Sequence, residues 1–549
     1  MTFDAPHAWV RAWASETPNR LALATPSSRL SYRELDGRVD DVARVLTALG
    51  AQAGERVLSS LPLSPAAAVV ALAVQRIGAV SVELSREFSE NAQAAAFQRS
   101  RADVAVISGR DAARWQQLWS SKRPRSVAVV HDGSLLGFPQ LGHVDAHLQE
   151  DGVVVVAPTG LGRTSPEQRV FDDDAAALVL LTSGSSGSPV GVVLSSRNLA
   201  VNARAIAACL DLSARDHAMC VLPLSYAYGR SILHSHFVVG ASVFLDPRSL
   251  FPKLVVDTLR DEGCTNFSGV PVTYELLRRQ VEVQGHRLSS LRFVTQAGGA
   301  LSKETARWVR SAFAPAPLII MYGATEATAR LSWLPPSRAH KEGSIGLPIP
   351  GVSFRLVDDQ GADVADGAVG HLVASGRNVA LGYLDDEERA REVFRDGALW
   401  TGDLARVDED GCYFLVGRAR EMLKIAGHRT SPAEIEEELH SHDDIFDAAV
   451  IGMPDEVLGD VPVALIVLRP GIGVDDEALR LWLRRRLPAF KVPRFFARVM
   501  DLPRGPNGKV RRGELRALFE ETQRRATSAA SQQFVRQRGL DPEHTQEKQ

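Results

Sequence analysis

Apolar residues follow two alternating patterns along the first part of the chain. Val42, Val45, Leu46 and Leu49 recur at helical spacing and predict an amphipathic helix over residues 40–49. The short valine-rich runs 127–130 and 153–156 predict buried strands. Because helical periods and apolar runs alternate from residue 1 to about residue 170, we expect layers of helices around a mainly parallel sheet.

A glycine- and serine-rich stretch lies between two further apolar runs. The runs Ala175 to Leu181 and Val192 to Leu194 predict two strands, and the stretch predicts the loop that joins them. Glycine lets backbone N–H groups turn toward one point, and hydroxyl groups add donors, so the loop suits phosphate. A flexible connector is the alternative. No Gly-Lys-Ser/Thr follows at the spacing of a Walker loop, which excludes that motif. The candidate phosphate ligands are Thr182, Ser183, Gly184, Ser185, Ser186 and Gly187.

The composition narrows the class of protein. The chain has 549 residues, 45% of them apolar, enough for one large multi-lobed domain and a smaller one. A net charge of −3 argues against nucleic-acid binding, and no apolar run is long enough to span a membrane. The start of the chain lacks a secretory signal, and the four scattered cysteines lack metal-binding spacing. We therefore expect a cytoplasmic protein with buried thiols.

Two segments after the loop carry candidate chemistry. Leu318 to Met321 predicts a buried strand that delivers Tyr322, Gly323, Thr325 and Glu326 at its carboxyl end, where ligands bind in open α/β sheets. Mg²⁺ prefers oxygen ligands, so Glu326 is a candidate metal ligand; a solvated surface turn is the alternative. Upstream, Gly298 and Gly299 allow a flat ring to approach the backbone, or form a tight turn before a helix capped by Ser302.

In combination these stretches resemble the adenylate-forming enzymes, which include acyl-CoA and aryl-CoA synthetases, luciferases and the adenylation domains of peptide synthetases. Residues 182–189 resemble the family's phosphate loop, and Tyr322-Gly323-Ala324-Thr325-Glu326 resembles its Tyr-Gly-x-Thr-Glu motif. Residues 400–403, 417–427 and 502–511 resemble its ribose-binding segment, its hinge and its C-terminal Gly-Lys loop. The resembling segments occur in family order from about residue 30 to 515.

The resemblance implies a role for each matching residue. Tyr322 is expected to stack on adenine, Thr325 to bond the α-phosphate, and Glu326 to hold Mg²⁺. Asp403 is expected to bind the ribose and Lys509 to catalyse adenylation; an Asx turn and a lysine in a turn are the alternatives. The remaining implied positions are a ribose or phosphate contact at Arg418, a pivot at Arg420, and an acyl-pocket wall that includes Tyr226, Tyr228, Gly229 and Ala297.

The chain also departs from the family pattern. Val190 replaces the usual loop lysine, so we expect weakened ATP use, improved by Val190→Lys. Tyr226 stands where relatives often carry histidine, and a turn with packed tyrosines is an alternative for this wall. No Asp or Glu occurs from Val221 to Leu245, which disfavours an α-amino acid substrate. Arg230, His234 and His236 are expected to be solvated or capping residues rather than an anion site.

The predicted fold class is α/β, with a large multi-subdomain N-terminal domain of layered sheets and helices and a smaller mobile α+β C-terminal domain. The expected boundaries are 1–418 for the ATP- and carboxylate-binding domain, 419–522 for the C-terminal domain and 523–549 for a disordered tail. Ser196 is expected to cap a helix to about Leu210, and Ser431 with Glu434 to form a capping box. Strands are expected at 448–451 and 463–467.

The resemblance implies a ligase that uses Mg²⁺ and ATP. A carboxylic acid would first form an acyl-adenylate and diphosphate. The acyl group would then pass to the thiol of CoA, or to the phosphopantetheine of an acyl carrier protein, after the C-terminal domain turns about Arg420. Two alternatives remain open: an amide synthetase, in which an amine replaces the thiol, and a degenerate nucleotide-binding protein, which only Val190 suggests. The identity of the acid and the oligomeric state are not readable from the sequence.

Overall fold

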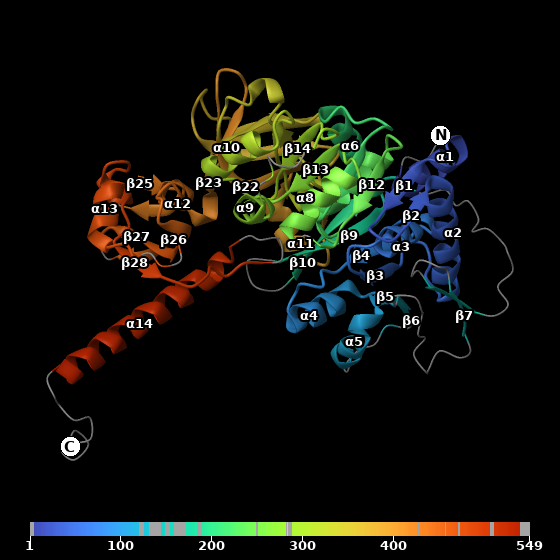
Figure 1. Cartoon of the computed structure of the whole chain (residues 1–549), viewed down its shortest axis with the longest axis horizontal. Coiled ribbons are helices and arrows are strands. Elements are labelled where there is room, and N and C mark those ends of the chain that lie inside the picture. The colour runs from blue at the N-terminus through green and yellow to red at the C-terminus, as the bar shows by residue number, and fades with distance from the viewer. Residues whose placement is uncertain are drawn as a thin grey trace, which may run out of the picture. The chain divides into compact units, whose positions relative to one another are not determined.

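The computed structural model describes residues 5–119, 124, 126–130, 144–148, 154–158, 172–183, 189–248, 251–281, 283, 288–425, 428–455, 457–469, 471, 473–505 and 510–537. The chain divides into two compact units, Met1–Leu415 and Val416–Gln549. Figure 1 shows the mixed helices and strands of both units, in agreement with the predicted α/β class.

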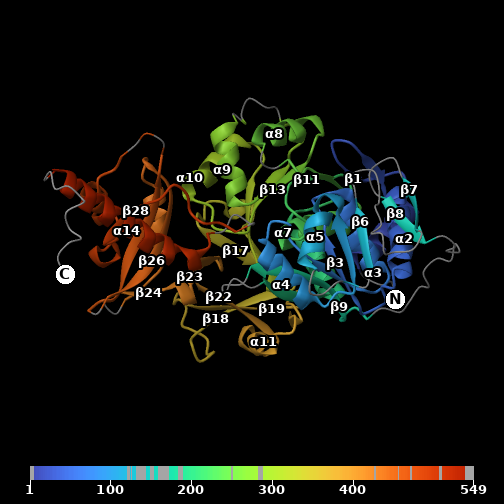
Figure 2. The same ribbon diagram turned by 90° about the horizontal axis from the view of Figure 1, so that it is seen from below.

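Unit 1 begins with helices and mostly parallel strands. The strands of its first sheet lie in the order β20-β10-β9-β4-β3-β5-β6, and β4, β3, β5 and β6 run parallel to one another. Figure 2 shows α4 and α5 beside this sheet. The elements are α1 (Pro6–Glu16), β1 (Leu21–Ala24), β2 (Arg29–Ser31), α2 (Tyr32–Ala48), β3 (Arg56–Ser60), α3 (Pro65–Arg76), β4 (Val80–Glu83), α4 (Glu90–Ser100), β5 (Val104–Ser108), α5 (Ala112–Leu118) and β6 (Ser126–Val130).

The first valine-rich run and the amphipathic helix are confirmed. Val42, Val45 and Leu46 are buried on α2, and residues 127–130 lie in β6. The second valine-rich run is not part of the parallel sheet. It forms β8 (Val154–Pro158), which pairs antiparallel with β7 (Val144–Leu148) in a separate two-stranded sheet.

The second sheet of unit 1 carries the segments that resemble the nucleotide site. Its central strands β12, β11, β13, β14 and β15 are parallel, because a helix returns the chain after each strand. The chain first completes the first sheet with β9 (Ala176–Ser183) and β10 (Pro189–Ser195). The elements that follow are α6 (Ser196–Cys209), β11 (His217–Cys220), α7 (Ala227–Phe237), β12 (Ser242–Leu245), α8 (Pro252–Asp261), β13 (Asn266–Gly269), α9 (Pro271–Gln280), β14 (Phe293–Gln296), α10 (Lys303–Ala312) and β15 (Leu318–Tyr322).

An antiparallel extension continues that sheet beyond β15. The strand order there is β15-β16-β17-β23-β22-β19-β18, and β21 pairs with β22. The elements are the 3₁₀ turn η3 (Thr325–Ala327), β16 (Ser332–Trp333), β17 (Ser344–Pro348), β18 (Val352–Val357), β19 (Gly370–Gly376), α11 (Glu387–Val393), β21 (Phe394–Arg395), β22 (Ala398–Val407) and β23 (Tyr413–Arg418), with further short 3₁₀ turns at Gly109–Asp111 and Pro336–Arg338. Between β19 and α11, β20 (Gly382–Tyr383) returns to the first sheet and pairs with β10.

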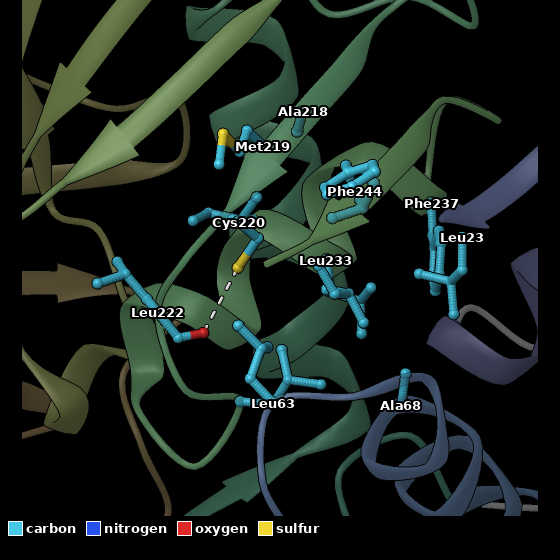
Figure 3. Close-up of a cluster of buried hydrophobic side chains, with 14 of the residues drawn as sticks. Leu23, Leu63, Ala68, Ala218, Met219, Cys220, Leu222, Leu233, Phe237 and Phe244 are labelled. Atoms are coloured by element: carbon cyan, nitrogen blue, oxygen red, sulfur yellow. Dashed lines mark hydrogen bonds between the residues drawn. The ribbon is translucent and has the colours of Figure 1, made fainter. Parts of the chain in front are cut away.

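The largest core of unit 1 lies between helices and the central strands of the second sheet. Figure 3 shows part of it, where Leu23 of β1, Ala68 of α3 and Phe237 of α7 surround the side chains of β11 and β12. Cys220 lies in this cluster, and its thiol donates to the carbonyl of Leu222 at 3.5 Å. All four cysteines are free and buried, as the sequence predicts.

Unit 2 packs helices on a five-stranded, mostly antiparallel sheet of order β25-β24-β27-β26, with β28 parallel to β27. The strands expected at 448–451 and 463–467 are parts of β26 and β27. The elements are η5 (Ala419–Glu421), β24 (Leu423–Ile425), β25 (His428–Thr430), α12 (Pro432–His440), β26 (Ile445–Asp455), β27 (Gly459–Leu468), α13 (Asp476–Arg484), a 3₁₀ turn at Ala489–Lys491, β28 (Phe495–Arg498) and α14 (Arg512–Gln537).

Helix ends both confirm and correct the sequence analysis. Ser302 caps α10, and its hydroxyl accepts from the N–H of Thr305 at 3.1 Å. The cap of α6 is Ser195 instead of Ser196, because Ser195 exchanges hydrogen bonds with Asn198 three residues on. Ser431 precedes α12 without a side-chain capping bond, because Glu434 pairs with Lys491 at 2.7 Å instead of turning back.

The end of the chain also differs from expectation. Residues 523–537 continue helix α14, where the sequence analysis expects a disordered tail. The helix formers Gln, Arg and Ala are frequent in this segment, and they favour helix even without an apolar stripe. Among the described residues, no helix has both the length and the apolar character needed to cross a bilayer.

Candidate active site

The predicted strand–loop–strand is a hairpin. β9 and β10 pair antiparallel with Ser183 opposite Pro189 and Thr182 opposite Val190. Thr182 is half-buried, and its hydroxyl donates to the carbonyl of Val190 at 3.3 Å. Gly184, Ser185, Ser186 and Gly187 lie outside the described residues, as does the side chain of Ser183. The hairpin that would present a phosphate loop is therefore present.

Val190 does not occupy a surface position in this hairpin. Its side chain is 3% exposed and packs in a cluster with Leu178, Leu180, Val192 and Leu194. The residue that replaces the family lysine is thus part of the apolar layer beneath the sheet. A lysine here would have to carry its ammonium group out of that layer.

The predicted strand Leu318–Met321 is β15, which ends at Tyr322. Residues 322–326 are half-buried, whereas 327–330 are buried. The N–H of Leu331 donates to the carbonyl of Tyr322 at 2.8 Å, so the chain folds back on itself directly after the motif. A Cβ on Gly323 would lie 1.8 Å from the carbonyl oxygen of Ala329, which is why only glycine fits there.

Two hydrogen bonds join the motif after β15 to strands of both sheets of unit 1. The hydroxyl of Tyr322 donates to Oδ2 of Asp403 on β22 at 2.5 Å. The hydroxyl of Tyr383 on β20 donates to Oε1 of Glu326 at 2.8 Å. The structure therefore brings Tyr322, Asp403 and Glu326, which are far apart in sequence, to the carboxyl end of one strand. Tyr383 is not among the site residues predicted from the sequence, so it is a candidate site residue that the sequence analysis missed.

The donor set fits a bound Mg²⁺. Tyr383 bonds only Oε1 of the Glu326 carboxylate, and the Thr325 hydroxyl belongs to the neighbouring residue in η3. No group of three or more His, Cys, Asp or Glu side chains suited to a metal occurs in the described part of the chain. One carboxylate completed by substrate phosphates is a common way for proteins to bind Mg²⁺.

The expected acyl-pocket wall consists of the ends of β13 and β14 and the start of α7. Gly298 has a φ of +88°, and a Cβ there would lie 2.5 Å from the hydroxyl oxygen of Tyr226. The hydroxyl of Tyr228 lies 2.8 Å from Oγ1 of Thr295. Burial raises the pKa of Tyr226 to about 12, although nearby Arg330 opposes this shift, so the phenol stays protonated at neutral pH. Gly229 and Ala297 are buried beside it, and Gly299 is exposed.

The polar residues of α7 correct another expectation. Arg230, His234 and His236 are between 2% and 3% exposed, so they are neither solvated nor capping residues. Arg230 pairs with Glu83 at 2.7 Å inside the protein. Burial is the main reason that the pKa values of both histidines are lowered, to about 4 for His236, so both are neutral at pH 7. The partner strand β4 carries no signal that could have predicted this pairing.

The expected hinge and C-terminal loop lie at and beyond the boundary of the units. Arg418 ends β23 and Arg420 lies in η5. Lys509 lies outside the described residues, but both ends of its loop are visible: Arg504 and Val510 form an isolated β-bridge. Within unit 2, Arg504 also pairs with Asp447. The loop is thus held at its base.

This fold and site define a class, the nucleotide-dependent enzymes that place a Tyr-Gly-x-Thr-Glu segment at a strand end. The family model described as AMP-binding enzyme matches residues 10–384, and the AMP-binding enzyme C-terminal domain matches residues 434–509. The chain belongs to the AMP-binding enzyme family.

Three known proteins illustrate the similarity. A feruloyl-CoA synthase from Amycolatopsis is 31% identical over 515 residues, which is 93% of this chain and 98% of the relative. ATP-bound MatB from Rhodopseudomonas palustris has a TM-score of 0.82 at 26% identity, covering 94% of this chain and 99% of that one. The amide bond synthetase McbA from Marinactinospora thermotolerans has a TM-score of 0.81 at 26% identity, with the same coverage.

Proposed function

We propose that this protein is an AMP-forming acid–thiol ligase, which activates a carboxylic acid with ATP and transfers the acyl group to the thiol of CoA. The observation that carries the proposal is the joining of Tyr322 to Asp403 and of Glu326 to Tyr383 at the end of β15. The match to a CoA synthase over 93% of the chain supports the choice of a thiol acceptor.

In the first half-reaction an oxygen of the substrate carboxylate attacks the α-phosphorus of ATP, and diphosphate leaves. Tyr322 would cover the adenine, Asp403 would bind the ribose, and Thr325 would donate to the α-phosphate. Mg²⁺ held by Glu326 would neutralise the phosphate charge. Lys509 would lie between the two anions, where a cation lowers the barrier most. The Tyr322–Asp403 hydrogen bond orients both side chains before the nucleotide binds.

In the second half-reaction the thiol sulfur attacks the acyl carbon, and AMP leaves with the bond electrons. We place the pivot of the accompanying domain movement at Arg420, and Arg418 would contact the ribose or a phosphate. Because the same adenylate serves any nucleophile, phosphopantetheine on a carrier protein and amines remain alternative acceptors. The similarity to an amide bond synthetase supports testing amines.

A diphosphate-exchange assay over a library of carboxylic acids tests the first half-reaction. We expect acid-dependent exchange with a raised KM for ATP, because Val190 supplies no loop cation. Failure of every acid to support exchange would contradict the proposal and favour a nucleotide-binding protein without turnover. CoA, a carrier protein and amines are then offered to the preformed adenylate, and a thioester with CoA is the expected product.

Lys509→Ala separates the two half-reactions. Exchange should fall about 100-fold or more, because one preorganised charge is worth that much in a transition state. Thioester formation from supplied acyl-adenylate should be spared. Lys253→Ala removes an exposed lysine of α8 and serves as the matched control. Equal loss of both half-reactions would contradict the role given to Lys509.

A further inference from the structure

Arg330 is a buried cation to which the described part of the chain offers no carboxylate. Arg330 is 3% exposed, and its buried Nε has no hydrogen-bond partner. Burial lowers the pKa of its guanidinium, and among the described residues Tyr228 and Tyr226 oppose this shift. An arginine stays charged in proteins, so the positive charge remains in the interior.

The contact with an aromatic ring offsets only part of the free-energy cost of burying the Arg330 charge. Cζ of Arg330 lies 3.8 Å from the centre of the Tyr228 ring. A cation–π contact with one ring is weaker than the hydration that a guanidinium loses when it is buried. The tyrosine contact therefore leaves part of the cost of burying this charge without compensation from the described residues.

The backbone around Arg330 is held in a strained shape that fixes the side chain. Thr328 has a φ of +70°, a rare conformation for a β-branched residue. Its hydroxyl donates to the carbonyl of Asn378 at 2.7 Å, which helps to maintain the turn. Asn202 accepts from the N–H of Arg330 at 3.3 Å and donates to its carbonyl at 2.8 Å. Strain of this kind gathers at functional sites.

Arg330 also lies behind the expected acyl wall. The Tyr226 and Tyr228 rings meet edge to face at 6.4 Å, and the Tyr226 hydroxyl faces Gly298. Exposure falls along this line, from exposed Gly299 through half-buried Tyr226 to buried Arg330. The fold-back between Tyr322 and Leu331 connects Arg330 to the nucleotide motif. Arg330 is therefore joined both to the expected acyl wall and to the nucleotide motif.

We propose that Arg330 binds a second anionic group of the acid substrate, so that the preferred substrate is a dicarboxylic acid or an acid with another distal oxyanion. This inference rests on the proposed function and specifies its substrate class. The planar guanidinium offers two parallel N–H donors to a carboxylate. Tyr228 would hold the guanidinium plane from one face while the distal group binds its edge.

A series of matched acids tests the proposal. Linear monoacids and α,ω-diacids of four to nine carbons, and benzoic acid with its three carboxybenzoic counterparts, are compared by acid-dependent diphosphate exchange. We expect one diacid to exceed its isosteric monoacid about 100-fold in kcat/KM, because a monoacid leaves the buried charge unpaired. Monoacids that equal or exceed every diacid would overturn the proposal while leaving the ligase function intact. No exchange with any acid would instead contradict the ligase function.

Variants of Arg330 assign the selectivity to this side chain. Arg330→Met should lower the diacid-to-monoacid ratio of kcat/KM about 100-fold, mainly through the KM of the diacid. Arg330→Lys keeps the charge without the planar fork and should lower the ratio by less. Arg355→Met removes an exposed arginine of the same unit and should leave the ratio unchanged. An unchanged ratio in folded Arg330→Met or Arg330→Lys would overturn the assignment.

Discussion

Two arginines of unit 1 are almost equally buried but lie in opposite electrostatic surroundings. Arg230 on α7 is 2% exposed and faces Glu83 of β4 at 2.7 Å. Arg330, after the nucleotide motif, is 3% exposed and faces two tyrosines but no carboxylate. The chain neutralises the first charge itself. The second has no such neutralisation within the described residues, which is the arrangement expected of a ligand-binding side chain.

The surroundings of Arg230 explain why it is structural. Its Nε donates to the carbonyl of Leu224 at 3.0 Å, which ties the start of α7 to the preceding turn. The contact with Glu83 is an ion pair outside hydrogen-bond geometry, and Glu83 also accepts from the Ser81 hydroxyl at 2.8 Å. This pair fixes β4 against α7, so its loss should be felt in stability.

The largest predicted effect is that of Glu83→Gln on folding. Removal of one partner leaves the Arg230 charge buried without compensation, and the free energy of unfolding should fall by about 3–5 kcal/mol. Urea denaturation measures this change. The double variant Glu83→Gln/Arg230→Met should recover most of the loss, because no uncompensated charge remains. A loss below about 1 kcal/mol in the single variant would mean that the pair is not the structural contact described.

Val190→Lys would add a further buried cation to unit 1, and its effect on folding is expected to be smaller than that of Glu83→Gln. Its neighbours in the hairpin are apolar, so the free energy of unfolding should fall by about 2 kcal/mol unless the ammonium reaches solvent along its stem. Val190→Met, which is long but uncharged, is the matched control. The sequence analysis expects Val190→Lys to improve ATP use, whereas the structure predicts a loss of stability. The KM for ATP and the free energy of unfolding of the same variant show which of the two occurs. Unchanged stability with a lower KM would show that the ammonium escapes the core.

The comparison of the arginines also shows what the sequence could reveal. The hairpin β9–β10, the strand before Tyr322 and the cap at Ser302 were predicted, because each depends on residues adjacent in the chain. The partners Glu83 of Arg230 and Tyr383 of Glu326 could not be predicted, because strand pairing and helix packing bring them together from distant segments. The burial of Val190 was missed for the same reason. A charged residue in a sequence does not reveal whether its counter-charge belongs to the chain or to a ligand.

Arg330→Met should change the free energy of unfolding in the opposite direction from Arg230→Met. Because the variant removes a buried charge that has no carboxylate, we expect the free energy of unfolding to be retained or to rise by about 1 kcal/mol. Arg230→Met should lower it by about 3–5 kcal/mol, because it leaves Glu83 unpaired. Denaturation of both variants without ligand makes the comparison. A loss of several kcal/mol in Arg330→Met would show that the cation–π contact is structural and would weaken the case for a ligand.

The smallest predicted effect is a pH dependence of stability. It comes from a cluster of paired, titratable side chains in unit 2. Asp447 faces Arg504 and lies 3.1 Å from Nε2 of His440. Burial favours neutral His440, but the hydrogen bond and charge of Asp447 outweigh it, so the pKa of His440 is raised above 6.5. Burial likewise opposes ionisation of Asp447, but its bonds to His440 and the charge of Arg504 lower its pKa below 3.8.

The sign of each shift sets the pH dependence. The contribution of His440 is fully present below pH 6.5 and is lost as the pH rises through its raised pKa. The contribution of Asp447 is present above pH 3.8 and is lost as the pH falls through its lowered pKa. The free energy of unfolding of the full chain should therefore fall as the pH rises above 6.5, by less than about 1 kcal/mol, because the His440 side chain is partly solvated. His440→Gln should remove this slope, whereas Glu83→Gln should leave it intact, since the Arg230 pair does not involve His440. A slope that persists in His440→Gln would assign the pH dependence to another group.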